Sequence, residues 1–85
     1  MFGGREELVT LEAKEHLAGV VIDRFGKSLT FIKCDFGFRF SVRVIVSPTF
    51  FAWVMGFGKN MRIVEPAPVR EEIKLMLKEI AKNYK

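Results

Sequence analysis

The stretch from Phe38 to Val46 (FRFSVRVIV) constrains the fold of this chain more than any other part of it. Apolar and largely polar positions alternate along its whole length, and successive side chains of a β-strand point to opposite faces of a sheet. The pattern therefore predicts a long strand with one wholly apolar face, which holds the phenylalanines, and one largely polar face, which holds the arginines. We expect this strand to be central in a sheet that helices cover on the apolar side.

Weaker patterns predict further strands on both sides of this one. Alternation favours strands at residues 8–13, 28–34 and 61–65. The tripeptide Asp35-Phe36-Gly37 supplies the acidic and glycine residues of a tight hairpin. The second of the three strands is therefore expected to turn back directly into the long strand.

Apolar residues that recur at helical spacing predict three helices. The first begins at Ala13 and ends before Gly26, where a left-handed cap would lie. The second begins at Pro48, because the Ser47 hydroxyl can accept an orphan backbone N–H and proline at the first helical position loses no hydrogen bond. The third follows the turn at residues 66–68. The expected inner stripes are Ala13, Leu17, Val20, Val21 and Phe25; Phe50, Trp53, Val54 and Phe57; and Val69, Ile73, Met76, Leu77, Ile80 and Tyr84.

This order of elements predicts an α+β fold with the ferredoxin-like arrangement β-α-β-β-α-β, a four-stranded antiparallel sheet and an additional C-terminal helix. Right-handed crossovers place the first two helices on the same face of the sheet. The opposite face would carry polar side chains, among them Thr10 and Glu12. We expect a surface for a ligand or partner there, unless the last helix covers it, and its candidate residues are Arg39, Ser41, Arg43 and Arg62.

Size, composition and charge exclude several classes of protein. With 85 residues, of which 49% are hydrophobic, the chain has the size and core of one globular domain. The net charge of +4 weakly favours anionic partners, although a charge of this size usually serves solubility. The longest uncharged run, residues 44–58, is interrupted by Pro48 and is too short to span a membrane. We therefore expect no membrane partner.

The residue types needed for catalysis or metal binding do not occur in telling patterns. The one histidine, His16, and the one cysteine, Cys34, have no partner at a suitable spacing. We expect His16 to face solvent and Cys34 to fill space. An exposed charged segment is expected from the early carboxylates Glu6, Glu7, Glu12 and Glu15. The sequence predicts no enzyme, no cofactor and no metal, and its single cysteine fits a reducing cytoplasm.

Much of the chain is similar to one module of bacterial transcriptional regulators. The most specific segment is a Trp-containing helix that ends in Gly-x-Gly, at residues 50–58, followed by an alternating strand, a proline and a helix that ends on Tyr84. The other segments that carry the resemblance are 8–11, 21–26, 61–66 and 69–70. Together they resemble the C-terminal extension of WYL-domain regulators, the module often called WCX.

The resemblance implies an accessory role in regulation. In that family a winged helix-turn-helix domain binds DNA, a WYL domain senses a ligand that is often nucleic acid, and the extension helps to build or regulate the dimer. The expected partners are a second copy of the chain and the WYL domain of the same regulator, with a nucleic-acid effector and with DNA contact only through an N-terminal domain. Residues 1–6 would then be a linker from an upstream WYL domain.

Surplus apolar residues on two helices indicate a protein interface. Phe51 and Met55 stand four residues apart on a side that the inner stripe of the second helix does not need, and Leu75 lies outside the stripe of the third. We predict that these three residues contact a partner. The alternative is that the three helices pack against one another and bury them.

A different class of function is a stand-alone domain that binds single-stranded nucleic acid or a small anionic ligand on the basic sheet face. RNA-recognition domains of this fold stack bases on aromatic strand residues, and Phe36-Gly37-Phe38-Arg39-Phe40 leads into the long strand. Against their consensus, Cys34 stands where Lys or Arg belongs and Asp35 where Gly belongs. The two phenylalanines within the strand also share the parity of the core valines, which predicts that their rings are buried.

Overall fold

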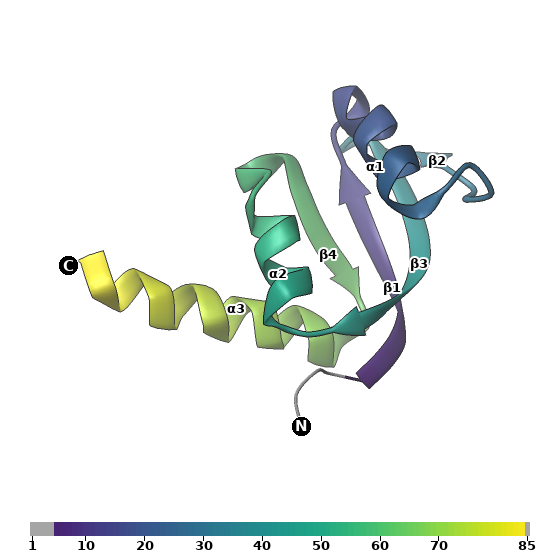
Figure 1. Ribbon diagram of the computed structural model, residues 1–85. Coiled ribbons are helices and arrows are strands. Elements are labelled where there is room, and N and C mark those ends of the chain that lie inside the picture. Colours follow the sequence, from purple (N-terminus) through teal and green to yellow (C-terminus); the bar gives the residue numbers. More distant parts are fainter. Residues whose placement is uncertain (1–4, 85) are drawn as a thin grey trace.

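The computed structural model describes residues 5–84, and Figure 1 shows the path of the chain. Within that range the main elements are β1 (Arg5–Ala13), α1 (Ala18–Phe25), β2 (Ile32–Lys33), β3 (Phe38–Val46), α2 (Pro48–Met55), β4 (Met61–Glu65) and α3 (Ala67–Ala81). Short 3-10 turns lie at Glu15–Leu17, Gly58–Asn60 and Lys82–Tyr84. Of the helices in the described range, none has both the length and the apolar character that crossing a membrane requires.

The described strands form one antiparallel sheet in the order β2-β3-β1-β4. Strand β3 pairs with β1 along its whole length, from Arg5 opposite Val46 to Ala13 opposite Phe38. The long alternating strand is therefore central, and the α+β fold with its ferredoxin-like strand order is confirmed.

Helices α1 and α2 cover the same face of this sheet (Figure 1). An edge-to-face contact between the rings of Phe25 and Trp53, with centroids 5.4 Å apart, links the two helices. Phe38 and Phe40 are buried beneath them, as their parity predicts. Removing a ring of that size from water stabilises the fold by about 1.5–3 kcal/mol. The largest fully buried side chains in the described range are those of Phe40, Leu11, Val9, Val21 and Val69.

The first helix begins later than predicted. Ala13 belongs to β1, where it pairs with Phe38 on one side and Met61 on the other, so it cannot open a helix. The chain leaves the sheet only after Lys14, whose backbone N–H donates to the carbonyl of Asn60 at 2.9 Å. The prediction that Val20 faces inward is also wrong, because it is exposed on α1.

The second strand is much shorter than the predicted range of residues 28–34. Only Ile32 and Lys33 pair with β3. Upstream of them the chain is held by aromatic packing, since the ring of Phe31 lies 4.6 Å from Phe38 and 5.9 Å from Phe40. The predicted hairpin is confirmed by reciprocal backbone hydrogen bonds of 3.1 Å between Cys34 and Gly37.

The predicted start of the second helix is confirmed. The Oγ of Ser47 accepts a hydrogen bond from the backbone N–H of Phe50 at 3.3 Å, and Pro48 occupies the first turn of α2. At the end of α1, Gly26 has a φ of 96°, which L-residues rarely adopt. Its ψ of 171° places it outside the left-handed helical region that was predicted.

Helix α3 packs on the body of the domain through its N-terminal half, and its C-terminal half extends away from the body (Figure 1). Val69 and Ile73 are buried, whereas Leu77 and Ile80 of the same stripe are exposed. Arg5 of β1 forms ion pairs with Glu7 and with Glu72 of α3. Strand β1 begins at Arg5, so residues 5 and 6 of the expected linker belong to the sheet. Residues 1–4 of that linker lie outside the described range.

The described part of α3 leaves the polar face of the sheet uncovered. Leu8, Ile32 and Ile45, one on each of three strands of that face, are all more than half exposed. This face is called the open face below.

Candidate functional site

The open face carries the polar residues that alternation assigned to it. The hydroxyl groups of Thr10 and Ser41 are hydrogen-bonded at 2.7 Å across β1 and β3. Arg39 and Arg43 follow the same face of β3, and Arg62 leaves β4 on that side. Their placement agrees with the predicted arrangement, whereas their role in binding stays a prediction.

Glu12 of β1 is the centre of this face. It stands directly opposite Arg39 on β3 and Arg62 on β4, so the sheet register places its carboxylate between two guanidinium groups. Nε and Nη2 of Arg39 donate to Oε2 at 3.0 and 2.7 Å. Nε and Nη2 of Arg62 donate to Oε1 at 2.9 and 2.6 Å. Both carboxylate oxygens are thus held by charge-assisted hydrogen bonds.

Glu12 was expected to be exposed together with the other early carboxylates. This expectation is wrong for Glu12, because the residue is only 4% exposed. Hydrogen bonds from Arg39 and then Arg62 lower the pKa of its carboxyl group, and desolvation opposes them. The carboxylate is therefore ionised at neutral pH. The hydrogen bonds to Glu12, and then its charge, raise the pKa of Arg39.

The ring of Phe36 completes the cluster from the hairpin between β2 and β3. The Nζ of Lys14 lies 4.1 Å from the ring centroid, and the Cζ of Arg62 lies 4.2 Å from it. Both positions are typical of cation–π contacts. The turn can lie this close to β1 because Gly37 has no side chain: a Cβ there would overlap the carbonyl oxygen of Ala13 and come within 2.8 Å of Lys14 Cα.

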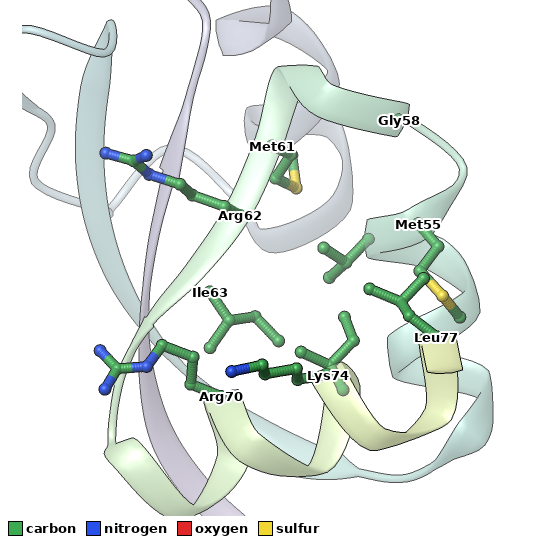
Figure 2. Close-up of a pocket in the computed structure, with 10 residues that line it drawn as sticks. Met55, Gly58, Met61, Arg62, Ile63, Arg70, Lys74 and Leu77 are labelled. Carbon is green, nitrogen blue, oxygen red and sulfur yellow. The ribbon is translucent and has the colours of Figure 1, made fainter. Parts of the chain in front are cut away.

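A third arginine borders the same region. Nη1 of Arg70, in α3, donates to the backbone carbonyl of Val64 at 3.1 Å. Figure 2 shows Arg62 and Arg70 directed to the same side of β4, away from Met55 and Leu77. One shallow hollow is lined by Glu12, Arg39, Arg62, Ile63, Val64 and Arg70. We call Glu12, Arg39, Arg62 and Arg70 the arginine cluster.

The structure brings together only part of the predicted ligand face. Arg39 and Arg62 meet at Glu12, but Ser41 is bonded to Thr10, and Arg43 borders a separate hollow with Arg24. Glu12, Arg70 and Phe36 were not predicted as site residues. The one available signal for Glu12 was its position on the polar side of a strand, opposite two arginine-bearing strands.

A second concave surface lies between α2, β4 and α3 (Figure 2). This groove has a volume of about 500 Å³ and is mainly apolar. Its apolar lining consists of Val54, Met55, Met61, Ile63, Ile73 and Leu77. The exposed end of the α3 stripe continues the same surface beyond the groove, and we call the two together the α3 apolar surface.

The three predicted interface residues do not share one surface. Phe51 is only 5% exposed and belongs to the core, so the expectation that it is surplus to the core is wrong. Met55 lines the groove. Leu75 is 59% exposed but lies two positions from both Ile73 and Leu77, which is about 200° around the helix axis and on the other side of α3.

The residue types that could serve catalysis or metal binding do not gather into a site in the described range. His16 is exposed, as predicted, and Cys34 is partly buried. Within residues 5–84, no three His, Cys, Asp or Glu side chains gather as metal ligands would. The arginine cluster and the groove are therefore considered below as candidate binding surfaces.

Comparison with known proteins identifies a family for this chain. Residues 5–81 match the family model of the WCX domain. No curated protein and no solved structure matches the chain.

Proposed function

Because the chain belongs to the WCX family, the C-terminal extension found in WYL-type transcriptional regulators, we propose that it joins two copies of its regulator and couples effector sensing to the geometry of that dimer. The family assignment agrees with the resemblance seen in the sequence. The proposed role is binding rather than catalysis, in a cytoplasmic regulator that contacts DNA through another domain.

The α3 apolar surface is the observation that carries this proposal. Leu77, Ile80 and Tyr84 continue the apolar stripe that begins with the buried residues Val69 and Ile73. The side chains of these three residues are exposed. An exposed apolar patch that continues a groove is typical of protein interfaces. A second copy of the chain, or the WYL domain of the same regulator, would cover it.

The same surface supports a mechanism based on dimer geometry. Helix α3 is anchored at one end and exposed at the other, so a partner on its exposed half would contact the groove and the helix together. An effector that binds one arrangement of the two copies better than another shifts the population toward that arrangement. The DNA-binding domains would then follow that shift.

The test compares two substitutions on opposite sides of α3. Leu77→Glu places a charge in the α3 apolar surface, and Leu75→Glu places the same charge on the other side, at similar exposure. In light scattering after size exclusion, we expect the wild-type chain to dimerise, Leu77→Glu to weaken the dimer at least tenfold, about 1.4 kcal/mol, and Leu75→Glu to leave it unchanged.

Two outcomes would contradict this proposal. A wild-type chain that stays monomeric at high concentration would exclude self-association of the domain. Equal weakening by both substitutions would spread the interface around α3, and weakening by Leu75→Glu alone would place it on the other side of the helix, as the prediction for Leu75 implies. Circular dichroism of both variants would show whether either loses the fold.

A further inference from the structure

We propose that the arginine cluster is a binding site for a phosphate group, in which Arg39, Arg62 and Arg70 supply the donors and Glu12 is a positioning residue. The site lies on the open face. Arg62 and Arg70 also border the groove, but their side chains are directed away from Met55 and Leu77 (Figure 2), and the site uses no apolar side chain of the α3 apolar surface as a donor. It therefore goes beyond the dimerisation role and does not depend on it.

The first argument is the donor capacity that Glu12 leaves. A guanidinium group carries five N–H donors. Glu12 accepts from Nε and Nη2 of Arg39 and of Arg62, which leaves Nη1 of each arginine unused by the carboxylate. Arg70 uses Nη1 on the carbonyl of Val64, which leaves Nε and Nη2. Donors from three arginines thus border one hollow that is open to solvent.

The second argument is that the donors are already held in place. Glu12 is buried and holds both guanidinium planes, although the arginine side chains themselves are 46% and 59% exposed. The ring of Phe36 contacts Arg62 as well. A ligand that finds its donors in position loses less free energy to ordering them, because the long side chains are no longer free to move.

The third argument concerns charge. Three guanidinium groups border the hollow beside the Glu12 carboxylate, and Lys14 lies next to the cluster over the ring of Phe36. Glu65, opposite Thr10 in the sheet, is the second carboxylate that acts on Arg39, so the four cations exceed the two carboxylates by two charges. A phosphate dianion matches this surplus and offers oxygens to all three arginines, whereas a carboxylate carries one charge and two oxygens.

The site has no platform for a nucleic-acid base. Phe38 and Phe40 are buried in the core, and the ring of Phe36 is already contacted by Lys14 and Arg62. We therefore expect the site to bind the phosphate group without preference for a base. The phosphate can come from a small phosphorylated compound or from a nucleic-acid backbone, and the experiment must separate these sources.

The experiment is an NMR titration of the labelled chain at constant ionic strength. The probes are inorganic phosphate, a mononucleotide and a short single-stranded oligonucleotide, with chloride as the reference anion. We expect shifts at the Nε–H groups of Arg39 and Arg62 and at the backbone amides of β1 and β4. Arg70→Ala should weaken phosphate binding at least fivefold, because it removes one set of donors and leaves both partners of Glu12.

Two variants on the same face provide matched comparisons. Arg43→Ala removes the same charge outside the cluster and should leave the affinity unchanged. Glu65→Gln removes a negative charge near the cluster and should tighten phosphate binding about twofold. Leu77→Glu, which tests the dimer, should bind phosphate like the wild type, so failure of one proposal is distinguishable from failure of the other.

Each outcome supports or overturns the site. Similar affinity for phosphate and mononucleotide supports a small phosphorylated ligand, whereas a much tighter oligonucleotide complex with strong salt dependence supports a nucleic-acid backbone. Equal losses in Arg70→Ala and Arg43→Ala would reduce the effect to net charge and overturn the proposal. So would shifts from chloride as large as those from phosphate, or binding of an acidic peptide at the cluster without any binding of phosphate.

Discussion

The two faces of the central strands β1 and β3 are stabilised by different means. On the covered face, Phe40, Leu11 and their neighbours are held by burial, which depends on apolar area and shape and not on a particular partner atom. On the open face, Glu12 depends on two named arginines at fixed register positions. Burial tolerates some rearrangement, but a buried charge without its partners is costly.

The largest expected effect is on the covered face. Phe40→Ala should destabilise the chain by about 3–5 kcal/mol, because it removes a buried ring and leaves a cavity. Much of the stability of a small domain would be lost. Ile45→Ala, on the open face of the same strand, should cost less than about 0.5 kcal/mol. Urea unfolding measures both, and similar losses would show that the two faces do not differ as described.

The next effect tests the turn at Gly37, which lies against the end of β1. Gly37→Ala should cost about 1–3 kcal/mol, because its Cβ would overlap the backbone at Ala13 and Lys14. Gly19→Ala, in α1, meets no atom within 4 Å and should stabilise the chain by about 0.5–1 kcal/mol. A Gly37→Ala variant as stable as the wild type would show that the turn can move away from β1.

A smaller effect is expected at the carboxylate of the open face. Glu12→Gln should cost about 1–2 kcal/mol, because an amide cannot accept from two arginines as a carboxylate does, while the arginines are exposed enough to be solvated. Replacing both Arg39 and Arg62 by alanine should cost more than Glu12→Gln, since the buried charge then loses both partners. The reverse order in urea midpoints would contradict this account.

An exposed ion pair provides a reference for the stability loss expected from Glu12→Gln. Lys82 and Glu79 form a pair at 3.3 Å near the end of α3, with both side chains largely exposed. Glu79→Gln should change the stability by less than about 0.5 kcal/mol. A loss as large as that of Glu12→Gln would mean that burial of Glu12 is not what makes its pairs matter.

The smallest effect is the pH dependence of the Glu12 contribution. Its pKa is lowered from the ordinary value of 4.5, by hydrogen bonds from Arg39 first and Arg62 second. A carboxyl whose pKa is lower in the folded state stabilises the fold above the unfolded pKa, and this stabilisation is lost as the pH falls through the folded pKa. The difference in urea midpoint between wild type and Glu12→Gln should be constant near neutral pH and shrink below 4.5.

A difference that stays constant well below that pH would show that the charge of Glu12 contributes nothing to stability. Glu79→Gln provides the reference, because titration of the other carboxyl groups is common to both variants. Subtracting the pH dependence of the Glu79→Gln urea midpoint leaves the pH dependence that comes from the pairing of Glu12 with its arginines.

Local patterns predicted the parts of the fold that depend on neighbouring residues. The alternation of β3, the Ser47 cap and the turn at Gly37 each rest on a few consecutive residues, and all are confirmed. The left-handed cap at Gly26 is a local prediction that failed, but several other predictions failed because a distant segment decides the outcome. The two-residue β2 is one case, since Phe31 contacts β3 through its ring and not through the ladder.

The candidate site was predictable only in part, for the same reason. Parity placed Arg39 and Arg62 on the open face, but their distance from Glu12 follows from the pairing of β1 with both β3 and β4. Arg70 belongs to α3, and the apolar stripe of α3 does not predict where that helix lies relative to the sheet. The burial of Phe51 depends on the elements that surround α2. The apolar pattern of a short helix does not predict how many of its faces other elements cover.

By itself, the sequence determined the strand and helix types, the order of the elements, the family and the division of β3 into an apolar and a polar face, because these depend on periodicity and on residues close together in the chain. The tertiary structure alone decided that Glu12 is buried between two arginines and that the end of α3 is uncovered. Both depend on segments brought together across many residues, and their free energies come from burial and charge, which no single segment contains.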